Sequence, residues 1–177
     1  MTKHLLISRP EPGEYPDELN QYISLVPGND LLEYFILQPL SVASLGSTLS
    51  EEQLLYRYAE GKWSVKDIFC HLIDCERIYN YRALCIARGD KTELPGFEEN
   101  DYAKTANADA RQISDIIADY KSVRAASIEL FKSFDDKMVL RSGIANGSAR
   151  TVRAIGYSLA GHEIHHLNVI KERYLKK

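Results

Sequence analysis

The sequence has no long hydrophobic run. Its 177 residues are 45% hydrophobic and 27% charged, as in an ordinary globular domain. No segment approaches the roughly 18 consecutive apolar residues that a membrane-spanning helix needs. The apolar stretch Leu5–Ile7 is followed at once by Arg9 and two prolines, and it is too short for a signal peptide. We therefore expect no membrane partner and no export.

The sequence also lacks an excess of positive charge, and it has few cysteines. A formal net charge of -3 leaves no basic field that could neutralise a phosphate backbone, so nucleic acid is not an expected partner. The three cysteines, Cys70, Cys75 and Cys85, include no Cys-x-x-Cys pair. Their spacing favours reduced thiols over a disulfide framework. Together these features predict a cytoplasmic protein.

Helical periodicity is abundant by contrast. Apolar residues recur at helical spacing in four long segments, which begin near residues 30, 64, 109 and 152. Nothing alternates with the period of two that marks a half-buried strand over more than a few residues. Four long helices pack best as a bundle. Residues 30–177 are therefore predicted to form one all-α four-helix bundle domain, and residues 1–29, rich in Pro, Gly and acidic residues, an N-terminal arm.

Local signals mark the starts of the helices. Ser50 followed by Gln53, and Ser64 followed by Asp67, have the form of a capping box. They predict a short helix and the beginning of the second long helix. A turn ahead of the last long helix is predicted by a cluster of turn-forming residues, Gly143, Asn146 and Gly147.

The segment of residues 89–107 shows no periodicity. A loop of this length is uncommon in a compact domain unless it serves a site or is disordered. We expect it to lie over or beside the opening of a functional site, with Phe97 and Tyr102 shaping the wall of a substrate pocket. The alternative is a surface loop that packs its aromatic residues on the bundle.

Four of the five histidines lie in the second and fourth predicted helices. On a helical wheel, His166 falls close to the apolar stripe of the fourth helix and His162 at its edge, whereas His165 points away. Two histidines four residues apart can hold one ion between them. His71 lies beside the stripe of the second helix, so it can complete the set across the interface. The pattern predicts one divalent metal ion with open coordination positions.

Each of these residues also has a plainer interpretation. Histidines four apart occur by chance, and a buried histidine is more often a hydrogen-bonded core residue than a ligand. Glu163 falls near the centre of the core-facing stripe, so it is either a catalytic acid–base group beside the metal or half of a buried ion pair. Cys75, one turn after His71, is interpreted as a packing residue rather than a soft ligand. His4 and His165 are expected in solvent.

Two stretches carry a family resemblance. The first is Lys62–Asp67, which contains Trp63 and Ser64, followed by His71–Asp74, and the second is Gly161–His166. With these motifs the sequence resembles the DinB/YfiT-like family of metalloproteins over most of its length. The resemblance implies metal ligands at His71, His162 and His166, the trio that the helical wheels select independently.

The resemblance also implies an up-down-down-up bundle, often a homodimer, that binds nickel, zinc, iron or manganese. Relatives include S-transferases that use low-molecular-weight thiols, and proteins labelled metal-dependent hydrolases. We therefore expect a metal-dependent enzyme that activates a thiol or water for transfer to a small electrophile, of the thiol S-transferase type. Hydrolysis is the alternative, and a non-catalytic metal-stabilised dimer is the alternative from another class. The sequence does not specify the substrate, the metal or the thiol.

Overall fold

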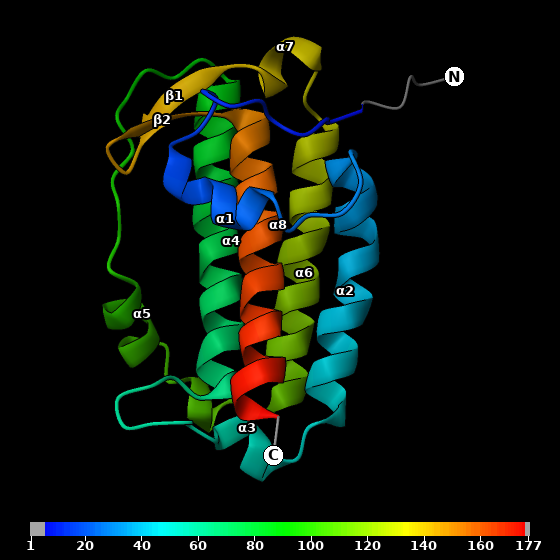
Figure 1. Ribbon diagram of the computed structural model, residues 1–177, viewed down its shortest axis with the longest axis vertical. Coiled ribbons are helices and arrows are strands. Elements are labelled where there is room, and N and C mark those ends of the chain that lie inside the picture. Colours follow the sequence, from blue (N-terminus) through cyan, green and yellow to red (C-terminus); the bar gives the residue numbers. More distant parts are fainter. Residues whose placement is uncertain (1–5, 176–177) are drawn as a thin grey trace.

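Four long helices run along the longest axis of the molecule (Figure 1). The computed structural model describes residues 6–175, without the side chains of residues 38–41. The long helices are α2 (Leu31–Thr48), α4 (Val65–Ala87), α6 (Ile113–Lys132) and α8 (Val152–Val169). In Figure 1, α4 and α6 run in one direction and α2 and α8 in the other. This confirms the predicted up-down-down-up four-helix bundle.

Shorter elements connect and cover these helices. They are a 3-10 turn at Asp17–Leu19, α1 (Asn20–Ile23), α3 (Glu51–Leu55), α5 (Glu99–Thr105), a 3-10 turn at Ala108–Ala110, α7 (Asp136–Val139), β1 (Ser142–Ala145), β2 (Ser148–Thr151) and a π-helical turn at Ile170–Tyr174. No helix within residues 6–175 combines the length and hydrophobicity needed to cross a membrane.

Side-chain caps fix where the site-bearing helices begin. Ser64 accepts a hydrogen bond from the Asp67 amide at 3.0 Å, and the Asp67 carboxylate accepts one from the Ser64 amide at 2.9 Å. This capping box starts α4, as predicted, and a second box between Ser50 and Gln53 starts α3. Thr151 caps α8 by accepting from the Ala154 amide. The caps set the positions along each helix at which the histidines lie.

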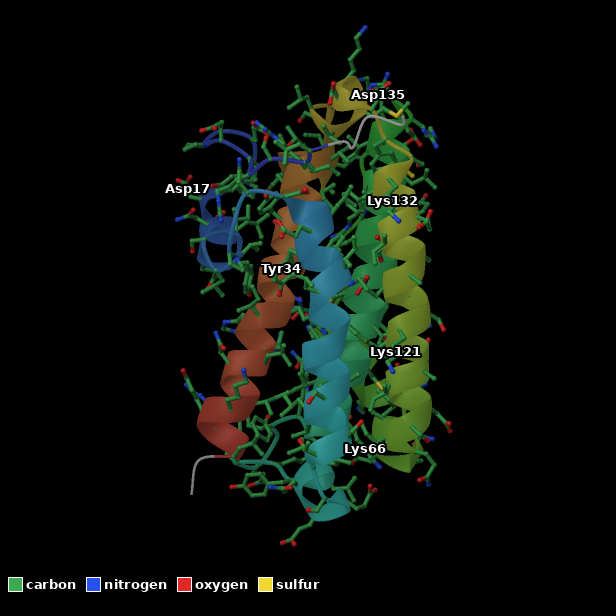
Figure 2. The ribbon with its side chains drawn as sticks, turned by 90° about the vertical axis from the view of Figure 1, so that its right-hand side faces the viewer. Asp17, Tyr34, Lys66, Lys121, Lys132 and Asp135 are labelled. Carbon is green, nitrogen blue, oxygen red and sulfur yellow. The ribbon has the colours of Figure 1, made fainter. Side chains whose placement is uncertain are left out.

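The N-terminal segment packs into the molecule. Ile7, Ile23 and Val26 are buried in the core, and α1 lies against α8. Figure 2 shows this segment, with Asp17 labelled, on the outer side of α8. The close approach requires glycine at position 161, because a Cβ atom there would lie 1.9 Å from the carbonyl oxygen of Tyr22. Tyr22 is thereby held beside the histidines of α8.

A β-hairpin adds a feature that the sequence analysis did not predict. Strands β1 and β2 pair antiparallel through the expected turn, in which Asn146 and Gly147 both have positive φ, 53° and 70°. The long segment of residues 89–107 pairs with this hairpin, because the Leu94 amide donates to the Ile144 carbonyl at 3.0 Å. The segment also contains α5. It is therefore an ordered connection rather than a bare loop.

Candidate metal centre

Three imidazoles converge between α4 and α8. His71 lies in the second turn of α4, and His162 and His166 lie one turn apart on α8. The Nε2 atom of His162 is 3.2 Å from that of His71 and 3.0 Å from that of His166. One ligand atom from each residue lies within 4.8 Å of the other two. The structure thus brings together the three residues that the sequence predicted as metal ligands.

The spacing of these nitrogens fits a shared cation. Nitrogens bound about 2.1 Å from one ion at tetrahedral or octahedral angles lie about 2.9–3.4 Å apart. The separations of the His162 nitrogen from those of His71 and His166, 3.2 and 3.0 Å, fall in that interval. Within residues 6–175, the cluster comprises three candidate ligands and no fourth. The residues therefore fit a divalent ion that keeps coordination positions open.

Burial keeps the three rings neutral. It lowers the pKa of His71 to about 4, and it lowers the pKa of His166 to about 3 with help from the neighbouring histidines. Burial and the same neighbours hold the pKa of His162 well below its usual range. A metal competes with protons for imidazole nitrogen. At neutral pH these nitrogens carry lone pairs that are free to coordinate an ion.

Aromatic rings surround the cluster. The Trp63 ring lies over His71 at a centroid distance of 4.6 Å and is stacked on His166 at 6.3 Å. Tyr22 contacts His162 edge-on at 5.4 Å. The Nδ1 atoms of His162 and His166 are buried without a hydrogen-bond partner in residues 6–175. On the Nδ1 side, ring packing rather than hydrogen bonding therefore orients these two imidazoles.

Glu163 forms the buried ion pair that was one of its two interpretations. Its Oε2 atom accepts a hydrogen bond from Arg124 at 2.7 Å and another from the Tyr120 hydroxyl at 2.8 Å. Burial raises the pKa of Glu163, while the Arg124 guanidinium opposes that shift. The structure therefore shows Glu163 in a buried ion pair, while its Oε1 atom is buried without a hydrogen-bond partner in residues 6–175. The catalytic acid–base assignment stays a prediction.

Arg124 connects three of the four long helices. From α6 it donates to Glu76 of α4 through Nε at 2.7 Å and Nη2 at 2.9 Å, and to Glu163 of α8. All three side chains are at most 2% exposed. The helical pattern of the sequence predicted an apolar stripe around position 124 and did not predict a buried arginine there. The signal was Glu163 itself, which needed a cationic partner.

The two residues predicted to shape a substrate pocket line one cavity together, but only Phe97 also lines the cavity that His162 reaches. Phe97 and His162 line one cavity of about 320 Å³. Tyr102 contacts the Phe97 ring at 5.1 Å, but it lines a neighbouring cavity that no histidine reaches. On the other side of the cluster, Asn100 and His166 line a cavity of about 200 Å³. The segment of residues 89–107 therefore lies beside the histidines, with Phe97 rather than Tyr102 facing their cavity.

The remaining candidates have simpler surroundings. His165 is half-buried, and its ring packs against Tyr22 at 5.4 Å instead of standing free in solvent. Cys75 is buried with its sulfur 3.5 Å from Nε2 of His71. His4 lies outside the described residues.

The chain is similar to known proteins in sequence and in fold. A sequence profile of the DinB superfamily matches residues 41–170. Among solved structures, YfiT from Bacillus subtilis, described as a probable metal-dependent hydrolase with an unusual four-helix bundle topology, superimposes with a TM-score of 0.70 at 17% identity. The match covers 92% of this chain and 89% of that chain. No curated protein sequence matches significantly. At this identity the likeness to YfiT concerns the fold.

Proposed function

Because the chain belongs to the DinB superfamily and gathers three neutral imidazoles at one point, we propose that it is a metal-dependent enzyme. In this proposal His71, His162 and His166 hold one divalent ion. The convergence of their ring nitrogens is the observation that carries it. YfiT, whose fold is similar, is described as a probable metal-dependent hydrolase. When bound, the ion would supply the Lewis acidity that lowers the pKa of a thiol or a water molecule.

A low-molecular-weight thiol is the nucleophile that the surroundings favour. Hydrolysis usually relies on a protein base that accepts a proton from water. In Glu163, the carboxylate that follows His162 in the sequence, the Oε2 atom already accepts hydrogen bonds from Arg124 and Tyr120. A thiol ionises more readily than water and needs no such base. The protein's own buried thiols are poor nucleophiles, because burial raises the pKa of Cys70 and of Cys75. We therefore favour transfer of an external thiol to a small electrophile.

Hydrolysis remains the second candidate, favoured by the description of YfiT. A purely structural metal is the third, and it would be expected to recruit a fourth protein ligand. Cys75 is the nearest residue of suitable chemistry, with its sulfur 3.5 Å from His71. Substitution of Cys75 shows whether the metal needs this sulfur as a ligand.

An assay on a cysteine-free variant tests the proposal. The variant with Cys70, Cys75 and Cys85 replaced by serine should keep its bound metal and its activity, because neither depends on a protein thiol. The metal-loaded protein would be incubated with bacillithiol, glutathione or cysteine and a halogenated arene, and the thioether product measured. Cys70 and Cys75 are buried, so replacing all three cysteines at once can disturb folding. The single variant Cys75→Ala is therefore measured beside it as a milder change.

The expected result is a metal-dependent rate above that of the buffer in both variants. Metal-dependent cleavage of a simple ester, with no acceleration of any thiol, would replace thiol transfer by hydrolysis. Loss of metal from Cys75→Ala, with its fold intact by circular dichroism, would instead indicate a structural site.

A further inference from the structure

Two arginines lie buried at the cavity that reaches His162. Arg82 belongs to α4 and is 4% exposed, and Arg150 belongs to β2 and is 6% exposed. Both line the cavity of about 320 Å³ together with His162. The bundle and the unpredicted hairpin therefore each bring one guanidinium to a single cavity beside the candidate metal centre.

Neither guanidinium has a carboxylate partner within residues 6–175. Arg82 donates to the Pro95 carbonyl oxygen at 2.7 Å and lies over the ring of Tyr79 at 5.6 Å. The Arg150 side chain makes no hydrogen bond to any group within residues 6–175, and its Nε atom is buried without an acceptor. Burial of an unpaired charge opposes folding. Two buried positive charges without a carboxylate partner in the described residues, of which the Arg150 side chain makes no hydrogen bond there at all, point to an anionic ligand.

The electrostatics of the pair agree with this interpretation. Burial lowers the pKa of both arginines. The positive charge of Arg82 lowers the pKa of Arg150 further, and the Glu18 carboxylate offsets only part of this shift. A bound anion would relieve both the desolvation and the mutual repulsion. Glu18 and Glu99 also line the cavity, but both are exposed and neither lies within ion-pair distance of the two arginines.

The other lining groups suit a small polar ligand. Asn146 in the hairpin turn and Ser148, which follows the turn, place an amide and a hydroxyl at the same cavity. Glycine at position 96 allows this arrangement, since a Cβ atom there would lie 2.1 Å from the Asn146 side-chain oxygen. Guanidinium groups bind carboxylates and phosphates through paired hydrogen bonds.

We propose that Arg82 and Arg150 bind the oxyanion group, a carboxylate or a phosphate, of the small-molecule substrate. Because His162 borders the same cavity, an anion held there lies next to a candidate metal ligand and directs the rest of the substrate to the centre. The identification of the ligand as a substrate rests on the proposed function. Binding of the anion itself requires only the arginines.

Anion titrations of the metal-free protein test the proposal. Succinate and inorganic phosphate would be titrated separately at constant ionic strength, after removal of any chelator by gel filtration, and binding followed by calorimetry and by the melting temperature. At least one anion should raise the melting temperature, and the stronger one identifies the group as carboxylate or phosphate. Arg150→Met should weaken its binding by about tenfold or more, the loss expected for a charged hydrogen bond.

Stability without any anion provides a second measurement. Arg150→Met should melt at the same temperature as the wild type or higher, because it removes a buried unpaired charge. Arg88→Met is the matched control, since Arg88 is exposed at the end of α4 and lines no part of this cavity. Glu18→Gln should leave stability unchanged and strengthen anion binding.

The opposite pattern overturns the anion site. If Glu18→Gln or Arg150→Met lowers the melting temperature and neither anion binds, the arginines pair with the protein's own carboxylates in solution. Metal-dependent activity with an unchanged KM in Arg150→Met would also reject the inference while leaving the proposed function intact. If the protein binds the anion but neither binds a metal nor shows metal-dependent activity, the proposed function is rejected and the anion site stands.

Discussion

Replacing His162 with alanine should abolish metal binding at micromolar metal. His162 is the central member of the cluster, because its Nε2 atom lies within 3.2 Å of the nitrogens of both His71 and His166. Loss of an outer-shell partner alone lowers metal affinity by about 10–100-fold, so loss of a direct ligand should exceed that range. Competitive titration against a chromogenic chelator measures the affinity, and any metal-dependent activity should fall with it.

The adjacent histidine provides the control. His165→Ala removes an imidazole from the same helix turn, but His165 is not a member of the converging cluster. This variant should keep wild-type metal affinity. Equal losses in His162→Ala and His165→Ala would indicate that disturbance of α8, rather than removal of a ligand, explains the effect.

Replacing Arg124 with methionine should destabilise the protein by about 3–5 kcal/mol, the cost of leaving buried carboxylates without their partner. Arg124 forms ion pairs with both Glu76 and Glu163, and all three side chains are at most 2% exposed. Because the arginine joins α4 to α8, the two helices that carry the histidines, metal affinity should fall as well. Urea denaturation measures the free energy of unfolding of the metal-free protein.

A variant of a surface arginine serves as the control for Arg124→Met, and a double variant tests for rescue. Arg77→Met breaks ion pairs with Asp74 and Asp119 near the surface and should cost no more than about 1 kcal/mol. Adding Glu76→Gln to Arg124→Met removes one of the stranded charges and should recover part of the stability. If Arg124→Met is no less stable than Arg77→Met, the buried ion pairs do not hold these helices together.

Local and periodic signals in the sequence predicted most of the bundle. The capping box of Ser64 and Asp67 marked the start of α4, and it therefore set the turn on which His71 lies. The four-residue spacing of His162 and His166, read against the apolar stripe, placed both rings on the inward face of α8. These inferences succeed because caps and helical periodicity depend on neighbours within a few residues.

The features that were missed depend on contacts between distant segments. Asn146–Gly147 is a strong hairpin signal, but strands of four residues are too short to show clear alternation. Arg124 lies in the buried stripe of α6, a position that patterning assigns to an apolar residue. Its place follows only from Glu76 and Glu163 on two other helices. Arg82 and Arg150 meet at one cavity only because the hairpin folds back over the bundle.

X-ray absorption spectroscopy of the wild-type protein tests the central claim most directly. The protein would be purified without chelator and loaded in turn with zinc, nickel, iron or manganese. We predict one tightly bound ion per chain, with three imidazole nitrogens and the rest of its shell from oxygen donors. A sulfur ligand at about 2.3 Å, or no stoichiometric binding of any of the four metals, would contradict an open three-histidine metal centre.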